Sequence, residues 1–426
     1  MRFLLTHLVT FATTVLLVLS IIEQVIFACP PSGYMPVQTF RDQMEQEDVT
    51  VIASLDSSNA PNGIENDNGS STFTIVKVLS TSTKSTLKPG DVIQKDRYEA
   101  GVISDLFLMT GICQNNHDVN KRLNEDRNPS LKRIETSHLA ASDFLWNSPL
   151  PASSELVSYL EGISPTMERV DQLRYFQEYL ESPNPHVGDD AFSEISRLSY
   201  DELVAFSPYM NPEKLRDYIN NKNTNITRIG HYGVMLGLSG DASDARMLEE
   251  RIRLNGESFR VGIDGLMKGY LLLARENGIS LLIETKIRPL SDLNSGVPFS
   301  EGYAAIQALR FAADEMGEEQ IGQEKVNEAM RLVLDCPELA DLVILDLARW
   351  EDWSIADRLV EMFHDERFHQ HGNQKAIVIY FMTVLDADMS KPSHPDDATI
   401  EKANTFIEEV QTSKPGLLRH ARNLYR

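Results

Sequence analysis

Two stretches of ten residues decide how most of this chain folds: Arg228-Ile-Gly-His-Tyr-Gly-Val-Met-Leu-Gly237 and, 32 residues later, Arg260-Val-Gly-Ile-Asp-Gly-Leu-Met-Lys-Gly269. Glycine stands at the same three places in both stretches, and methionine at the same fourth. A glycine inside a helix costs about 1 kcal/mol relative to alanine, so the repetition needs a structural reason. The spacing i, i+3, i+7 puts each set on one stripe of a helix, where a neighbouring helix can approach the backbone closely. The repeat predicts two closely packed helices. A phosphate-binding loop is disfavoured, because no Lys-Ser/Thr follows the glycines.

Weaker copies of the same pattern extend the repeat in both directions. They fall at Val187-Gly188, Gly302, Asp341 and Lys375, at intervals of 32 to 42 residues. A period of this length with helical spacing of apolar residues is typical of stacked helix pairs, each of which buries its apolar face against its neighbours. We therefore expect an all-α repeat domain over residues 151–426.

One copy carries a family resemblance. Residues 179–192 read Tyr-Leu-Glu-Ser-Pro-Asn-Pro-His-Val-Gly-Asp-Asp-Ala-Phe, in which a short proline turn joins two helices. Over residues 165–410 the chain resembles HEAT-like repeats, although the usual repeat arginine is present only in some copies, at Arg228 and Arg260. The resemblance implies a curved solenoid that serves as a scaffold, usually for protein partners.

Composition excludes several function classes. The 426 residues include 63 acidic and 40 basic side chains, which gives a formal net charge of −23. Nucleic-acid binding needs a dense basic surface, and no Lys/Arg cluster supplies one. The chain has three cysteines, too few for a disulfide-built miniprotein or a multi-thiolate metal domain.

The N-terminus predicts export. After Arg2 the chain is apolar from Phe3 to Ile22, and Ala28 stands before Cys29 as a signal peptidase site requires. Three outcomes stay open: cleavage after Ala28, which we favour; an uncleaved membrane anchor formed by residues 3–22; and lipidation of Cys29. All three place residues 29–426 outside the cytoplasm, in the periplasm, at the cell surface or secreted.

Residues 29–113 have the pattern of a small β domain. Val49, Val51, Ala53 and Leu55 alternate at period two, which predicts a strand with one buried face. Between Thr72 and Leu79 the apolar positions change phase, as they do at a β-bulge in a curled sheet. Asn62-Gly63 and Pro89-Gly90 supply turns, and residues 105–113 read as the last strand.

The order of these segments resembles the netrin-like, metalloproteinase-inhibitor-like form of the five-stranded OB barrel. A cysteine after the export segment, a helical stretch from Phe40 to Glu47, the strands and Pro89-Gly-Asp-Val-Ile93 match that layout. That family begins with Cys-x-Cys and has several disulfides, whereas here Cys29 is followed by two prolines. The resemblance implies the fold and, more weakly, a binding role. The chain as a whole resembles exported bacterial proteins that join these two domains, whose activity is not established.

Cys29 and Cys113 bracket this domain. In an oxidising compartment they could form a disulfide, and closing a loop of this length stabilises by about 4 to 5 kcal/mol. The alternative is a lipidated or unpaired Cys29 with a buried Cys113.

Residues 114–150 are polar and read as a connector, with Phe144 and Trp146 packing onto a neighbouring surface.

Few residues point to chemistry. No motif of a common hydrolase, zinc protease, redox or nucleotide-binding site occurs, and we predict no cofactor. The segment Arg349-Trp-Glu-Asp-Trp353 is a binding hot spot if Arg349, Trp350 and Trp353 are exposed, and core between helix hairpins if they are buried.

The second candidate is a histidine-rich turn. His364, His369 and His371 lie within eight residues and could bind a divalent metal, but their spacing matches no metal motif and a solvated turn is favoured. Cys336 reads as a buried or helix-end thiol. Asp189-Asp190 and Glu318-Glu319 read as solvated faces.

The sequence thus predicts a multidomain α+β chain. A signal peptide or anchor (1–28) precedes a small OB-like β-barrel (29–113), a connector (114–150) and an all-α HEAT-like solenoid (151–426). The leading function hypothesis is a non-enzymatic exported scaffold that binds a protein or cell-envelope partner through the solenoid. The alternatives are a regulator or inhibitor of an exported protease acting through the barrel, and a metal-dependent hydrolase in the solenoid groove.

Overall fold

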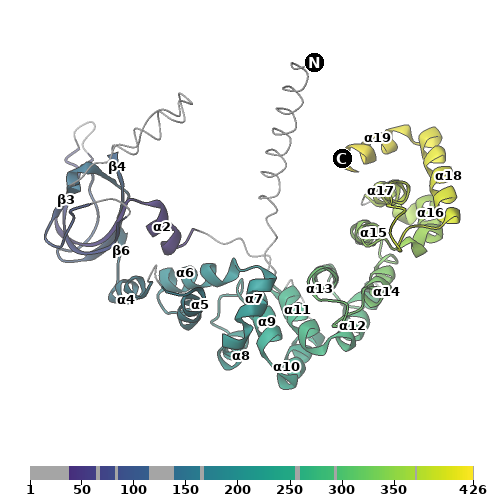
Figure 1. Cartoon of the computed structure of the whole chain (residues 1–426), viewed down its shortest axis with the longest axis horizontal. Coiled ribbons are helices and arrows are strands. Elements are labelled where there is room, and N and C mark those ends of the chain that lie inside the picture. Colours follow the sequence, from purple (N-terminus) through teal and green to yellow (C-terminus); the bar gives the residue numbers. More distant parts are fainter. Residues whose placement is uncertain are drawn as a thin grey trace, which may run out of the picture. The chain divides into compact units, whose positions relative to one another are not determined.

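A computed structural model describes residues 38–63, 68–81, 85–114, 139–163, 167–254, 260–291, 295–369 and 372–425. The described chain divides into two compact units, one up to Arg197 and one from Leu198 onward. A small antiparallel sheet comes first and a long series of helices follows (Figure 1), which confirms the expected α+β layout.

The first unit is built on one antiparallel sheet. Its strand order is β3-β2-β1-β4-β5, and the short strand β6 also pairs with β4. The strands are β1 (Val49–Asn59), β2 (Ser70–Thr81), β3 (Val92–Lys95), β4 (Leu106–Cys113), β5 (Phe144–Trp146) and β6 (Leu150–Pro151). The other elements of this unit are α2 (Phe40–Gln46), η1 (Ala141–Asp143), α4 (Ser154–Gly162), α5 (Arg169–Glu178) and α6 (Pro185–Ser196).

Strand β1 lies where the alternation of apolar residues predicted a strand. Val49, Val51, Ala53 and Leu55 are all buried, and they form the sheet's core with side chains such as Phe73 of β2. The predicted bulge is also confirmed: Ala53 pairs with Ile75 but Ile52 pairs with Lys77, so Val76 is the extra residue. Val76 is exposed, and Val78 then packs against the core. The bulge lets one strand keep its apolar residues inward along a bend.

Part of the expected connector belongs to the sheet. Phe144–Trp146 forms β5, which pairs with Gly111–Cys113 of β4. Phe144 is buried in the core, and the Trp146 indole Nε1 donates to the carbonyl of Ala141 at 2.9 Å. A strand of three residues is shorter than the alternation that reveals strands in a sequence, so the polar surroundings concealed it.

A buried acidic pair joins α2 to α6. Asp190 Oδ1 accepts the Phe40 backbone N–H at 2.6 Å, and Asp190 Oδ2 accepts the Tyr159 hydroxyl at 2.6 Å. Glu194, one turn further along α6, accepts the Thr39 hydroxyl at 2.6 Å and the Arg41 guanidinium at 2.9 and 3.0 Å. The expectation of a solvated face is therefore wrong for Asp190, because the carboxylate is covered by the N-terminal turn of α2.

We predict that Asp190 makes this unit less stable as the pH rises from about 4 to 6. Burial raises the pKa of Asp190 to about 6, while the bonds from Tyr159 and Phe40 oppose the shift and nearby Glu194 adds to it. The native state then holds a proton that the unfolded chain releases, so the contribution to stability falls with pH. Asp190→Asn carries no charge, and its stability relative to wild type should rise by about 2 kcal/mol between pH 4 and pH 7.

The measurement is urea unfolding followed through Trp146, in a background where Trp350 and Trp353 are phenylalanine. Parallel stability curves for the two proteins across this pH range would contradict the prediction.

The second unit consists of helices. Helices α9, α11 and α13 lie side by side as one layer, followed by α15 and α17 (Figure 1). The other helices pack against this layer. The elements are α7 (Tyr200–Phe206), η2 (Ser207–Tyr209), α8 (Pro212–Asn220), α9 (Ile229–Ser239), α10 (Ala242–Arg253), α11 (Ile263–Ala274), α12 (Glu276–Leu282), η3 (Ile283–Ile287), η4 (Arg288–Ser291), α13 (Phe299–Glu315), α14 (Gln323–Val333), α15 (Ala340–Arg349), η5 (Trp353–Ile355), α16 (Ala356–His364), η6 (Glu366–Phe368), α17 (Asn373–Leu385), α18 (Asp397–Ser413) and α19 (Pro415–Tyr425).

The two glycine stripes face each other, which confirms the prediction from the repeat. A Cβ built on Gly233 would lie 2.8 Å from the Gly265 carbonyl oxygen, and one on Gly237 would lie 2.6 Å from the Gly269 Cα. Gly262, which precedes α11, has a left-handed φ of +80° and leaves no room for a side chain against the Gly230 nitrogen. The backbones of α9 and α11 are thus in direct contact, which only glycine permits.

We predict that Gly265→Ala and Gly269→Ala each destabilise the second unit by about 3 kcal/mol. The new methyl groups would overlap the carbonyl oxygens of Gly230 and Gly233, and a backbone cannot rotate away as a side chain can. Urea unfolding measures the change.

Gly416→Ala is the matched control, because no atom lies within 4 Å of its added Cβ. Helix propensity alone would make all three variants more stable by up to about 1 kcal/mol. Stabilisation by Gly265→Ala would therefore contradict the close contact.

Candidate functional site

An exposed stripe runs along α13. Most of this helix is buried, but Phe299, Tyr303, Gln307 and Asp314 lie at least partly in solvent at spacings of four and seven residues. On α15, Leu345 and Arg349 are exposed one turn apart. Side chains at these spacings lie on one face of their helix.

Ion pairs and hydrogen bonds connect the two stripes. Arg310 of α13 donates from Nε to Asp346 Oδ2 of α15 at 2.7 Å. Asp314 Oδ2 accepts from Arg349 Nη2 at 3.1 Å, and Asp314 Oδ1 accepts from the Trp350 indole Nε1 at 3.4 Å. Burial raises the pKa of Asp346, an effect that the Arg310 guanidinium opposes. We call the exposed residues Tyr303, Asp314, Leu345 and Arg349, together with the partly exposed Gln307 and Trp350, the α13–α15 face.

Arg349 and Trp350, two residues predicted to bind, lie together on this face. The Arg349 guanidinium carbon is 5.4 Å from the centre of the Trp350 ring, within range of a cation–π contact. Both side chains are also held by the same Asp314 carboxylate. Asp314 and Tyr303 were missed by sequence reasoning, because nothing local to α13 shows that α15 lies beside it.

Trp353 lies elsewhere. Its indole Nε1 donates to the Ser393 carbonyl at 2.6 Å, and its ring packs edge-on against Tyr380 with the centroids 5.8 Å apart. The Tyr380 hydroxyl in turn donates to the Asp352 carbonyl at 2.9 Å. These contacts tie the turn after α15 to the segment between α17 and α18, so Trp353 has a structural position.

The histidine turn is only partly described. His364, at the end of α16, has its Nε2 3.5 Å from Glu409 Oε1 of α18. His369 is exposed, and His371 lies outside the described residues. Within the part of the chain that the structure describes, no group of three His, Cys, Asp or Glu side chains is placed to hold a metal.

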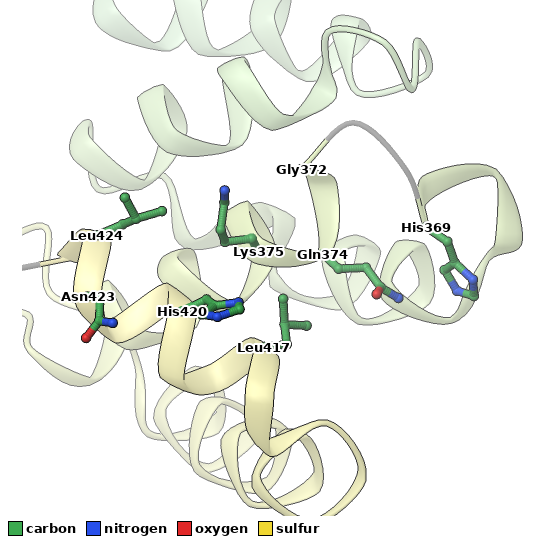
Figure 2. Close-up of a pocket in the computed structure, with 8 residues that line it drawn as sticks. All are labelled: His369, Gly372, Gln374, Lys375, Leu417, His420, Asn423 and Leu424. Carbon is green, nitrogen blue, oxygen red and sulfur yellow. The ribbon is translucent and has the colours of Figure 1, made fainter.

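His369 borders a pocket of about 540 Å³. Figure 2 shows Gln374 and Lys375 of α17 facing Leu417, His420 and Leu424 of α19, with His369 at the opposite end from Leu424. The lining contains cationic and amide side chains and no carboxylate, which does not suit a divalent cation.

The cysteines take structural positions. Cys113 is buried at the end of β4, where its backbone N–H donates to Asp48 Oδ2 at 2.8 Å. Its expected disulfide partner, Cys29, lies outside the described residues together with the export segment. Cys336 is buried as expected, and burial, with Glu338 beside it, raises the pKa of its thiol to about 11, which disfavours a nucleophilic thiolate.

The remaining expectations concern acidic pairs and the membrane. Glu318 and Glu319 are exposed as predicted, and so is Asp189. None of the helices in the described ranges is long and apolar enough to cross a membrane. Residues 3–22, which were predicted as a possible anchor, are not among them.

The sequence matches no protein-family model and no curated protein.

The two tryptophans should differ in their effect on stability. We expect Trp353→Ala to lower the free energy of unfolding by about 2 to 3 kcal/mol, because it removes a ring packed between two segments. Trp350→Ala should cost less than about 1 kcal/mol, since its contacts are with neighbouring surface side chains. Urea unfolding measures both, with Trp353→Phe as the control that keeps an aromatic ring. Equal losses for both alanine variants would show that Trp350 too is structural.

Proposed function

We propose that this protein is a non-enzymatic exported scaffold that binds a protein partner through the α13–α15 face. In this proposal the helices of the second unit, from Leu198 onward, form a HEAT-like solenoid and the sheet forms an OB-like barrel. The protein acts outside the cytoplasm, as the predicted export segment implies.

The packing of the helices supports the solenoid. Successive helices α9, α11 and α13 each contact the next, and α15 contacts α17, while the intervening helices pack on them. This is the arrangement that repeats of about 32 to 42 residues need in order to share one continuous core.

The strand order supports the barrel. In β3-β2-β1-β4-β5 the two edge strands are β3 and β5, and a closed OB barrel brings these edges together. Lys95 at the end of β3 donates from Nζ to the carbonyls of Trp146 and Asn147, at 3.3 and 2.6 Å. A side chain thus links the two edges of the sheet.

The observation that carries the function is the composition of the α13–α15 face. It presents Tyr303, Leu345, Arg349 and Trp350 on helices whose other sides are buried. Aromatic residues and arginine dominate binding hot spots, because they contribute large contact area and directional bonds. Asp314 holds Arg349 and Trp350 in place before binding, which lowers the entropy cost of association.

The other two hypotheses stay predictions. Regulation of a protease through the barrel requires a cleaved N-terminus at Cys29, and a metal site in the histidine turn requires His371. Both residues lie outside the described part of the chain.

The test begins by identifying the partner with a photo-crosslinking amino acid at exposed Leu345, and at exposed Glu361 of α16 as the control position. The affinity of the purified partner is then measured for wild type, for Arg349→Ala with Trp350→Ala, and for Glu361→Ala. We expect crosslinking at Leu345 alone and a loss of about 30-fold in affinity for the double variant, the size of a hot-spot deletion.

The Glu361→Ala protein should bind like wild type. Equal crosslinking at both positions, or unchanged affinity of the double variant, would contradict the proposal.

A further inference from the structure

A second pocket, of about 570 Å³, lies at the ends of two neighbouring helix hairpins. Its walls come from the turn between α8 and α9 and from the residues that flank α10 and α11. The glycine contact between α9 and α11 brings these turns together, because Gly230 and Gly262 stand at the starts of the two helices. The volume is in the range of small-molecule sites.

The pocket has an exposed apolar wall. Ile226, Leu254 and Val261 line it and are 59%, 65% and 38% exposed, so each presents apolar surface to solvent. Three such side chains on one concave surface mark a place where an apolar group can be covered.

The charges of the described lining are of one sign. Among the residues that the structure describes, Lys222, Arg251 and Arg260 line the pocket together with asparagines, and no carboxylate does. This is notable in a chain with a net charge of −23, whose surface is acidic on average. A cationic lining in an acidic protein favours an anionic ligand at that place.

Two polar atoms of the lining are buried without a hydrogen-bond partner. Arg260 donates from Nε to Glu301 at 2.6 Å and from Nη1 to the Arg251 carbonyl at 2.7 Å, but its buried Nη2 has none. Thr224, only 5% exposed, has a buried Oγ1 that is likewise without a partner. Leaving a buried polar atom unpaired costs free energy. Both atoms are closed off from solvent, so an acceptor in the pocket reaches them only after their side chains turn toward it.

The position of Arg260 is fixed by a buried ion cluster. Glu301 and Lys286 are fully buried, and Lys286 Nζ donates to the second oxygen of Glu301 at 2.5 Å. Because Glu301 is held from the other side, it fixes the position of the Arg260 side chain, which lines the pocket. This cationic side chain is therefore preorganised.

From these observations we infer that this pocket binds an anionic amphiphile, a hydrocarbon chain that ends in an oxyanion. The chain covers Ile226, Leu254 and Val261, and the oxyanion pairs with the cationic side chains of Lys222, Arg251 and Arg260. Carboxylate and phosphate ends share this chemistry. The inference uses no residue of the α13–α15 face, so it stands or falls separately from the proposed function.

The test is calorimetric titration of the full chain with three amphiphiles that have the same ten-carbon chain: decanoate, decyl phosphate and decyltrimethylammonium. We expect saturable binding of at least one of the two anions with a dissociation constant below about 1 mM, and binding of the cation at least about tenfold weaker. Tighter binding of decyl phosphate identifies phosphate as the natural end group, and tighter binding of decanoate identifies carboxylate.

Two variants probe the two parts of the site. Leu254→Asp places a negative charge on an exposed side chain of the apolar wall and should weaken binding of the preferred anion at least about tenfold. Arg251→Gln should reduce the preference for the anion over the cation. Met389→Asp is the matched control, since Met389 is 52% exposed between α17 and α18, and it should bind like wild type.

Three results would overturn the inference: no saturable binding of either anion, equal binding of anion and cation by wild type, or a loss in Met389→Asp as large as that in Leu254→Asp. Circular dichroism of each variant checks that it is folded.

Discussion

The direct backbone contact between α9 and α11 is the constraint on which the second unit depends. Glycines at spacings of three and four residues, Gly230, Gly233 and Gly237 facing Gly262, Gly265 and Gly269, let the two backbones approach to a distance that a side chain at these positions would prevent. Helix α13 packs on the other side of α11 and presents the exposed stripe that begins the α13–α15 face. At the starts of α9 and α11 the same contact brings together the turns that line the second pocket. One packing constraint thus underlies both proposed binding surfaces.

Buried carboxylates serve a related purpose in each unit. Asp190 and Glu194 hold the N-terminal turn of α2 in the first unit, and Glu301 joins Lys286 to Arg260 in the second. Burying a carboxylate is costly unless several donors surround it, and each of these has at least two. Burial raises the pKa of Glu301, but the bonds from Arg260 and Lys286 outweigh it, so the pKa lies below the ordinary value. Such clusters fix the direction of a segment more than they add stability.

The sequence predicted those features of the fold that produce a periodic pattern of residues. The alternation from Val49 to Leu55, the phase change near Val76 and the two glycine stripes all appear where expected, because each is a local pattern with one structural solution. Strand β5 was missed, since three residues are too short to show a period.

Contacts between segments far apart in the sequence could not be predicted, because a local pattern carries no information about them. The burial of Asp190 depends on a helix some 150 residues earlier, as the bond from Phe40 shows. Arg349, Trp350 and Trp353 are close in sequence, but a turn at Glu351, whose φ is +58°, lies between Trp350 and Trp353. Arg349 and Trp350 therefore contact Asp314, whereas Trp353 contacts Ser393. The second pocket is likewise assembled from turns of two hairpins, whose apolar residues look like ordinary loop positions in the sequence.

Hydrogen exchange of the full chain, followed by mass spectrometry, tests the central claim most directly. If the α9–α11 contact holds the second unit together, the amides of these two helices should exchange together and more slowly than those of α15, α17 or α19. Faster exchange of α9 and α11 than of α15 and α17, or different rates for α9 and α11, would contradict the account.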